Sequence, residues 1–274
     1  MTGDAEPLNQ QGVPVKSMMI QGPAGTLHVD DGGEGHVPVV FLHSLCGNTA
    51  HWAAQLGHLR KQRRAIALDL RGHGLSQYPA EGDYRVESMA ADVDAVANQL
   101  GLNTFVLVGH SMGGAVAITY ATLHPERIAG LLLVDTAGDP KQFSEDQIQG
   151  YMNALESDAY ATAIEDYWNQ ILIGSDPKVR ETVMQDLRQT RKDTVVALFR
   201  ELVRYDPLPA MGRYPGLKLI VFTPGNNTSY SLHNRLPWVP QVVVTGTGHW
   251  LHMDKPREFN RILDHFLETV GGAS

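Results

Sequence analysis

The stretch that decides the fold is Thr104–Thr122, TFVLVGHSMGGAVAITYAT. Its unbroken apolar run, Phe105 to Val108, is typical of a buried strand in a parallel sheet, and an Ala-rich helical pattern begins at Gly114. Between them stands GHSMG (residues 109–113), a G-x-S-x-G motif at a strand-to-helix turn. So tight a turn requires glycine two residues either side of the serine, and it leaves the serine hydroxyl exposed at a helix N-terminus. We therefore predict that Ser111 is a nucleophile.

Strands alternate with helical patterns along the rest of the chain, which is typical of the α/β class with a mostly parallel sheet flanked by helices. Helices are expected over Val86–Leu100 and Pro256–Val270. Seven further segments have the residue pattern of strands: Lys16–Gln21, Thr26–Asp30, Val37–His43, Arg64–Leu70, Ile128–Val134, Leu217–Phe222 and Gln241–Thr245.

One long segment departs from this alternation. Residues 139–211 are helix-rich and acidic and carry no strand pattern, and Ser144 with the acids after it is typical of a helix N-cap. We expect these residues to form a helical lid, inserted after the strand that ends at Asp135. The core domain would then comprise residues 1–138 and 212–274.

Composition excludes several classes of protein. The 274 residues carry a formal charge of −8 without a basic block, which argues against nucleic-acid binding. No run of about 18 apolar residues is present, and the polar N-terminal stretch lacks the apolar segment of a secretory signal. The single cysteine, Cys46, excludes an internal disulfide. We expect a cytoplasmic protein without a membrane span, metal or cofactor, and the sequence leaves its oligomeric state open.

A histidine follows the last predicted strand, in GTGHW (residues 246–250). A loop after a parallel strand lies at the carboxyl edge of the sheet, where ligand chemistry occurs in open α/β sheets. His249 could there accept the proton of Ser111 as general base and return it to the leaving group. His252 is the nearby competitor, which we rank lower because it lies in the run toward the last helix.

The loop after the third strand, His43–Asn48, stands where the second donor of an oxyanion hole is expected. By position that donor is the backbone N–H of Leu45, and the first is the N–H of Met112. An ordinary strand-to-helix turn is the alternative reading of this loop. We expect Cys46 to be an inert thiol, because nothing near it in the sequence activates it.

Taken together, these motifs resemble the α/β-hydrolase fold superfamily over most of the chain. The resemblance rests on HSLCGN (residues 43–48), DLRGHG (69–74), GHSMGG, LLLVDTAG, and GTGHW with the following DKPREF. It implies a lidded α/β hydrolase, in a family that includes carboxylesterases, lactonases, enol-lactone hydrolases, carbon–carbon bond hydrolases and cofactor-free haloperoxidases. Ser111 stands where dehalogenases and epoxide hydrolases have Asp. Ser44 stands where the family usually has Gly, and His-Ser-Leu is similar to the Asn-Ser-Leu of enol-lactone hydrolases.

The acid of the catalytic triad departs from the pattern of that family. Members usually carry it after the strand Leu217–Phe222, but TPGNNT (residues 223–228) follows here, and no Asp or Glu occurs between Asp206 and Asp254. Some members place the acid at the end of the preceding strand, which is the position of Asp135. We predict Asp135 as the acid, with Asp139 as the alternative.

The sequence therefore predicts a serine hydrolase that cleaves a neutral small-molecule ester or lactone through an acyl-enzyme, with acyl-homoserine lactones as one candidate substrate. A cofactor-free haloperoxidase, a perhydrolase or an acyltransferase with the same triad is the alternative enzyme. A ligand receptor on the same fold is the non-enzymatic alternative. Candidates for the substrate pocket are His43, Ser44, Trp52, Trp168 and Trp250.

Overall fold

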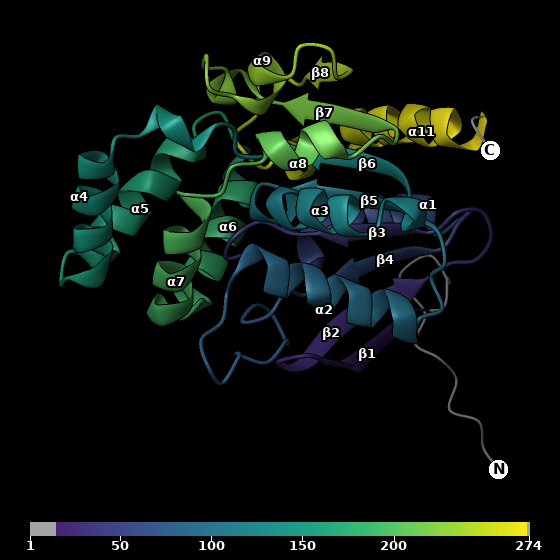
Figure 1. The fold of residues 1–274 in the computed structure, drawn as a ribbon, viewed down its shortest axis with the longest axis horizontal. Helices are drawn as coiled ribbons and strands as arrows, with labels where there is room; N and C mark the ends of the chain where they lie inside the picture. The colour runs from purple at the N-terminus through teal and green to yellow at the C-terminus, as the bar shows by residue number, and fades with distance from the viewer. Residues whose placement is uncertain (1–14, 273–274) are drawn as a thin grey trace.

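The computed structural model describes residues 15–272 and shows a twisted eight-stranded sheet with helices on both faces (Figure 1). The strand order is β1-β2-β4-β3-β5-β6-β7-β8; β1 pairs antiparallel with β2 and β2 antiparallel with β4, and all other pairs are parallel. The strands are β1 Val15–Gly22, β2 Gly25–Gly32, β3 Val39–Leu42, β4 Ala65–Leu68, β5 Phe105–His110, β6 Ile128–Val134, β7 Lys218–Phe222 and β8 Gln241–Val243. The N-terminal stretch in which we expected no secretory signal, residues 1–14, lies outside the described residues.

The central strands are short and apolar because both faces of the sheet are covered. Every residue of β3, β4 and β5 is buried. Helices α2 (Val86–Gln99), α3 (Met112–Leu123) and α8 (Leu208–Arg213) cover one face, and α1 (Ala53–Leu59) and α11 (Pro256–Gly272) cover the other (Figure 1). The predicted strands and the two predicted long helices are all present, with ends that shift by at most two residues.

The register of the parallel strands brings their carboxyl ends to one edge of the sheet. In the β5–β6 ladder His110 lies opposite Val134, so the next residues, Ser111 and Asp135, leave the sheet side by side. The N–H of Asp135 donates to the carbonyl of Val221 at 2.7 Å, which continues the β6–β7 ladder by one residue. The ends of β5, β6 and β7 therefore form a single platform.

Between β6 and β7 the chain leaves the sheet and forms four helices, α4 Glu145–Glu156, α5 Tyr160–Ile171, α6 Pro177–Gln189 and α7 Lys192–Leu202, which stand beyond this edge (Figure 1). Ser144 caps α4, as predicted, and it also forms a capping box with Gln147. The next helix, α8, packs against α3, so this four-helix insertion ends before α8 and not at residue 211 as expected.

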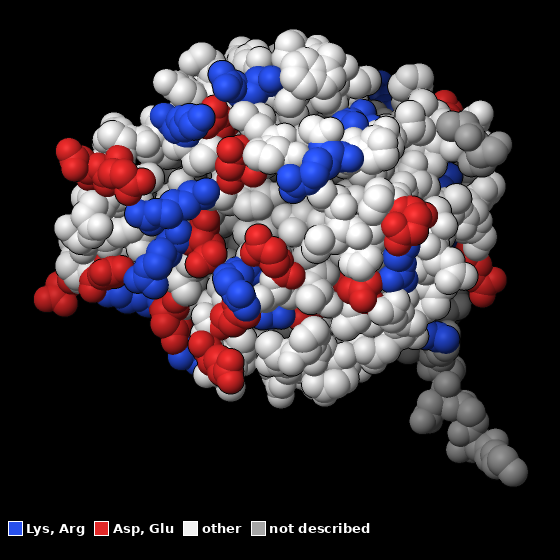
Figure 2. All heavy atoms as spheres, in the orientation of Figure 1, with Lys and Arg blue, Asp and Glu red and all other residues white. Residues whose placement is uncertain are grey.

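Charges of both signs are interspersed over the visible face of the insertion (Figure 2). Arg200 of α7 lies 2.6 Å from Glu156 of α4, and Arg204 lies 3.1 Å from Glu145. Exposed pairs of this kind contribute little stability each, so the apolar contacts of α4, α5, α6 and α7 with the main core hold the insertion in place.

The remaining elements are short: η1 Thr49–Trp52, η2 Pro125–Arg127, η3 Pro140–Gln142, η4 Pro224–Asn226, α9 Leu232–Arg235 and α10 Leu251–Asp254. Among residues 15–272, no helix combines the length and the apolar character that crossing a membrane requires.

Candidate active site

Ser111 occupies a strained turn between β5 and α3. Its backbone has φ 51°, in the left-handed region that non-glycine residues rarely adopt. A Cβ on Gly109 would lie 2.3 Å from the carbonyl oxygen of Gly113, and a Cβ on Gly113 would lie 2.4 Å from that of Leu42. Both glycines are therefore required by close backbone contacts, and the serine stands at the N-terminus of α3 as predicted.

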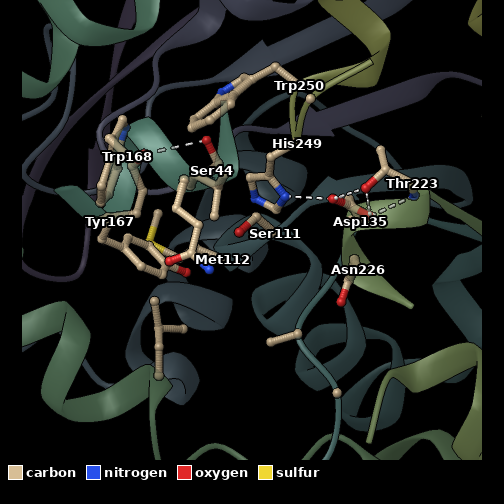
Figure 3. A pocket seen from close by; sticks show the side chains of 18 of the residues that line it. Ser44, Ser111, Met112, Asp135, Tyr167, Trp168, Thr223, Asn226, His249 and Trp250 are labelled. Atoms are coloured by element: carbon tan, nitrogen blue, oxygen red, sulfur yellow. Dashed lines mark hydrogen bonds and ion pairs between the residues drawn. The ribbon is translucent and has the colours of Figure 1, made fainter. Parts of the chain in front are cut away.

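His249 lies beside Ser111, on the loop after β8, and points one ring nitrogen at a carboxylate (Figure 3). Its Nδ1 is 2.6 Å from Oδ2 of Asp135, whose side chain is buried. An ionised carboxylate only accepts hydrogen bonds, so Nδ1–H donates to it and Nε2 is left as an acceptor. Figure 3 shows Ser111 on the side of the ring that faces away from Asp135. This arrangement allows Nε2 to take a proton from the serine hydroxyl.

Asp135 is oriented by its own backbone and by the neighbouring strand. It has φ 44°, which turns the chain sharply at the end of β6. The N–H of Thr223 donates to its Oδ1 at 2.9 Å, and the hydroxyl of Thr223 lies 3.1 Å from Oδ2. Asp139 instead caps the N–H of Lys141 and lies 3.3 Å from Arg235. The structure thus brings Asp135, and not Asp139, to His249.

The backbone of His249 is held from both sides. Its N–H donates to the carbonyl of Ile171, at the end of α5, at 2.9 Å. Its own carbonyl accepts from Nε2 of His110 at 3.0 Å. Burial holds the pKa of His110 well below its ordinary value, so this ring is neutral. Both the sheet and the insertion therefore fix the position of the candidate base.

The competitor, His252, is fully buried and does not line the cavity. Its ring stacks on Trp52 with 4.1 Å between centroids. Neither ring nitrogen has a hydrogen-bond partner, and burial lowers its pKa well below the ordinary value. The environment of His252 is that of a core residue.

The predicted oxyanion-hole residues, Leu45 and Met112, both line the cavity with Ser111. Met112 is the first residue of α3, where a helix leaves its N–H groups without intrahelical partners. Neither the N–H of Leu45 nor that of Met112 donates a hydrogen bond within the described part of the chain. Cys46, in the same loop, is buried, and burial raises the pKa of its thiol to about 12. An inert thiol was expected there, and this pKa agrees.

A cavity of about 630 Å³ opens over these groups. Its walls come from the carboxyl edge of the sheet and from the insertion. Apolar and aromatic side chains of the insertion that line it include Phe143, Tyr167, Trp168, Ile171, Phe199 and Leu202. No Lys or Arg is among the described residues that line it. Such a cavity suits an uncharged, largely apolar ligand.

Of the five predicted pocket residues, Ser44, Trp168 and Trp250 line the cavity. The prediction was wrong for Trp52 and His43, which are both fully buried. Trp52 precedes α1 and packs on the opposite face of the sheet, with its ring 4.8 Å from that of Phe41. His43 points back beneath its own loop, where both ring nitrogens find backbone partners.

Sequence reasoning missed several groups that build this site. Thr223 orients the acid, and Ile171 and Asp254 hold the histidine loop: Oδ2 of Asp254 accepts from the N–H of Gly248 at 2.9 Å. The position of Thr223 at the end of a strand was the one available signal for it. Nothing local marks Ile171, because its contribution is a backbone carbonyl. Among residues 15–272, no group of three or more His, Cys, Asp or Glu side chains is arranged to hold a metal ion.

Comparison with known proteins gives a consistent result. A family model described as the alpha/beta hydrolase fold matches residues 37–256. Esterase YbfF of Escherichia coli K12 is 30% identical over 254 residues, covering 84% of this chain and 92% of that protein. A dihydrolipoyllysine-residue acetyltransferase component of the acetoin cleaving system of Pseudomonas putida is 29% identical over 86% of this chain, and the match spans 65% of that longer relative.

Two solved structures are similar over nearly the whole chain. A thermophilic esterase from Thermogutta terrifontis superposes with a TM-score of 0.79 at 25% identity, covering 93% of this chain and 99% of the other. Est816, described as an N-acyl homoserine lactone degrading enzyme, has a TM-score of 0.79 at 22% identity, covering 91% of this chain and 100% of the other. At that identity the second similarity concerns the fold alone.

Proposed function

Because the chain belongs to the α/β-hydrolase family, we propose that it is a serine hydrolase that cleaves carboxylic esters or lactones through an acyl-enzyme intermediate. One observation carries the proposal: His249 is hydrogen-bonded to a buried carboxylate and lies beside Ser111 in a cavity. The relative named esterase YbfF supports the reaction class. The geometry supports the following roles for the individual residues.

In the first half of the reaction, Oγ of Ser111 attacks the substrate carbonyl carbon while Nε2 of His249 removes the hydroxyl proton. Asp135 stabilises the imidazolium that forms, because its carboxylate lies 2.6 Å from Nδ1. The N–H groups of Leu45 and Met112 donate to the oxyanion of the tetrahedral intermediate. The intermediate then collapses: the carbon–oxygen bond to the alcohol breaks, and the imidazolium returns its proton to the leaving oxygen.

In the second half, water replaces the serine hydroxyl as the attacking group. His249 takes a proton from this water, and the hydroxide attacks the acyl carbon of the ester formed with Ser111. The same two N–H groups stabilise the second oxyanion. As this intermediate collapses, the bond from the acyl carbon to Oγ of Ser111 breaks, the imidazolium of His249 returns its proton to Oγ, and the carboxylic acid is released. The proposed steps use no metal or organic cofactor.

In this proposal the insertion, residues 139–207, acts as a lid and supplies the walls of the acyl site. Trp168 and Phe199 line the cavity from α5 and α7, and Tyr167 of α5 is partly exposed toward it. Since no cationic side chain lines the cavity, a carboxylate on the substrate would lose its hydration without gaining a partner. We therefore propose a neutral ester or lactone with a small to medium acyl group, a class that includes acyl-homoserine lactones.

The test is a panel of p-nitrophenyl esters of increasing acyl length, with neutral lactones measured in parallel. Ser111→Ala should lower kcat/KM by at least 10³-fold with an unchanged melting temperature, since only one oxygen is removed. His249→Gln should be similarly impaired, whereas His252→Gln should keep most of the activity. An active-site fluorophosphonate should label the wild type but not Ser111→Ala. Wild-type protein that neither hydrolyses any ester or lactone nor takes the label would refute the proposal.

A further inference from the structure

His43 lies beneath the loop that we propose as half of the oxyanion hole, and none of the catalytic steps uses its ring. Its Nε2 is 2.9 Å from the backbone nitrogen of Leu70, and its Nδ1 is 2.7 Å from the carbonyl oxygen of Ser44. A backbone N–H only donates and a carbonyl only accepts. Nε2 must therefore be the acceptor, and Nδ1 must carry the proton that is donated to Ser44. The two partners fix the tautomer of the ring.

The carbonyl of Ser44 accepts a second hydrogen bond, from the N–H of Gly47 at 2.9 Å. This bond closes a tight turn in which Cys46 has φ 60°. A carbonyl held by two donors cannot swing toward the cavity without breaking both bonds. The orientation of the whole Ser44–Leu45 peptide is thus set from its carbonyl side.

A peptide group is planar and trans, so its N–H points away from its carbonyl. The bonds that hold the Ser44 carbonyl therefore also direct the N–H of Leu45. That N–H has no acceptor within the described part of the chain, and Leu45 lines the cavity together with Ser111. The free donor is what an oxyanion hole requires.

The second donor belongs to the same packed unit. A Cβ on Gly113 would lie 2.4 Å from the carbonyl oxygen of Leu42 and 2.6 Å from that of His43. The first turn of α3, which carries the N–H of Met112, therefore rests directly on the backbone of His43. A shift of the His43 loop would change the spacing between the two donors.

We propose that His43 is a positioning residue of the oxyanion hole, whose Nδ1–H holds the Ser44–Leu45 peptide so that the Leu45 N–H meets the developing oxyanion. The inference rests on the proposed hydrolase function, and His43 itself does not touch the substrate. Burial lowers the pKa of His43 to about 3, so the donating tautomer persists throughout the neutral range.

Two substitutions separate the roles of the two ring nitrogens. In His43→Asn the side-chain amide nitrogen reaches the position of Nδ1 and can still donate to Ser44. In His43→Gln the amide oxygen reaches the position of Nε2 and can accept from Leu70, but the donor to Ser44 is lost. We expect His43→Gln to lower kcat for p-nitrophenyl butyrate by about 10²-fold with KM changed less than about threefold, since the oxyanion exists only in the transition state. His43→Asn should stay within about tenfold of the wild type.

His73 provides the matched control. It is buried beside His43, with 5.0 Å between ring centroids, and its Nδ1 bonds to the carbonyl of Arg71 and not to the oxyanion loop. His73→Gln should lower the melting temperature but keep kcat within about threefold. A trifluoromethyl ketone, which forms a tetrahedral adduct with the serine, should bind His43→Gln more weakly by the same factor as the loss in kcat/KM, and His73→Gln with wild-type affinity.

The failure of this inference can be told from the failure of the proposed function. If Ser111→Ala is inactive but folded His43→Gln keeps kcat within threefold, the positioning role of His43 is overturned. If Ser111→Ala is itself active, the hydrolase proposal fails first. Should both His43 variants fail to fold, ¹⁵N NMR of the histidine rings in the wild type decides: a ring of His43 protonated at Nδ1 supports the inference, and one protonated at Nε2 overturns it.

Discussion

Replacing Asp135 by Asn tests the acid of the proposed triad, because the structure shows what the amide must do. If the amide oxygen keeps the hydrogen bond from Thr223 N–H, which is 2.9 Å long, the NH₂ group takes the place of Oδ2, 2.6 Å from Nδ1 of His249. An NH₂ group donates, so Nδ1 must give up its hydrogen and Nε2 must carry one. Nε2 then cannot accept the proton of Ser111, and the base is lost.

The amide can flip, and the cost of the flip sets the residual activity. A flipped amide turns its NH₂ group toward the N–H of Thr223 and leaves two buried donors unpaired, at about 1–3 kcal/mol each. With about 1.4 kcal/mol per tenfold, that penalty of about 2–6 kcal/mol leaves between about one molecule in 30 and one in 25,000 in the competent state. These molecules also lack the negative charge that stabilises the imidazolium. We expect kcat/KM to fall by about 10⁴-fold, as it does when the acid of a serine triad is amidated.

The assay is hydrolysis of p-nitrophenyl butyrate at pH 8, with circular dichroism and a thermal melt to show that the fold persists. Asp139→Asn is the matched control, since Asp139 is as buried as Asp135 but bonds to Lys141 and Arg235. It should lose less than about tenfold in rate. A severe loss in Asp139→Asn with a mild loss in Asp135→Asn would move the acid to Asp139, and activity within tenfold in both would refute the triad.

Three further outcomes are expected. In steady-state kinetics, Asp254→Asn should lower kcat by about tenfold with little change in KM. The carboxylate of Asp254 accepts hydrogen bonds from Gly248 N–H, Ser175 Oγ and Asp176 N–H, and a single amide oxygen cannot replace it. An unchanged kcat would contradict the role of Asp254 in holding the histidine loop. In urea unfolding, Gly109→Ala should destabilise the protein by about 3 kcal/mol or more, because the new Cβ would lie 2.3 Å from the Gly113 carbonyl oxygen. Gly57→Ala in α1 should stabilise the protein by up to about 1 kcal/mol, because a Cβ there meets no other atom. Equal effects of the two substitutions would contradict the packing argument. The free energy of unfolding should fall as pH drops from 7 to 5.5, because five histidines have pKa values depressed mainly by burial. They stay neutral in the fold but bind protons in the unfolded chain below their ordinary value of about 6.5. They are His43 (pKa about 3), His73 (about 4), His110, His233 and His252. Each of them contributes at most about 1.4 kcal/mol per pH unit, and His28, whose pKa is raised by the hydrogen bond that it donates to Asp69, acts in the opposite direction. Unfolding curves that coincide at the two pH values would refute this assignment.

Most of the fold was predictable because the signals are local. The apolar run before Ser111 and the alternation of strands and helices predict a parallel sheet, and the structure has that sheet. The expected limits of β3 and β4 were too long, since only Val39–Leu42 and Ala65–Leu68 pair with neighbouring strands. Pairing depends on a partner strand, which composition does not reveal.

The side chains that surround the site were less predictable, because their direction depends on tertiary packing. Trp52 and Trp168 are both aromatic and both fully buried, yet one packs under the sheet and the other lines the cavity. The sequence does not tell which tryptophan packs under the sheet and which lines the cavity. The hydrogen bond from the His249 N–H to the Ile171 carbonyl was also not predictable, since any residue type can supply a backbone carbonyl.

The fold fixes where the carboxylate of the triad must lie, but it does not fix which strand supplies that carboxylate. His249 needs a carboxylate oxygen at Nδ1, and any loop at the carboxyl edge that reaches this point can supply it. Strands β6 and β7 are paired neighbours, with Val134 opposite Val221, so their ends lie about 5 Å apart. The positive φ of Asp135 turns the chain at the end of β6, and Thr223 at the end of β7 holds the carboxylate through its N–H and its hydroxyl. The residue after β7, the strand that usually precedes the acid, therefore donates hydrogen bonds to the carboxylate of Asp135 instead of supplying a carboxylate. The loop beyond it contains Asn226 and no carboxylate, and it forms part of the cavity wall.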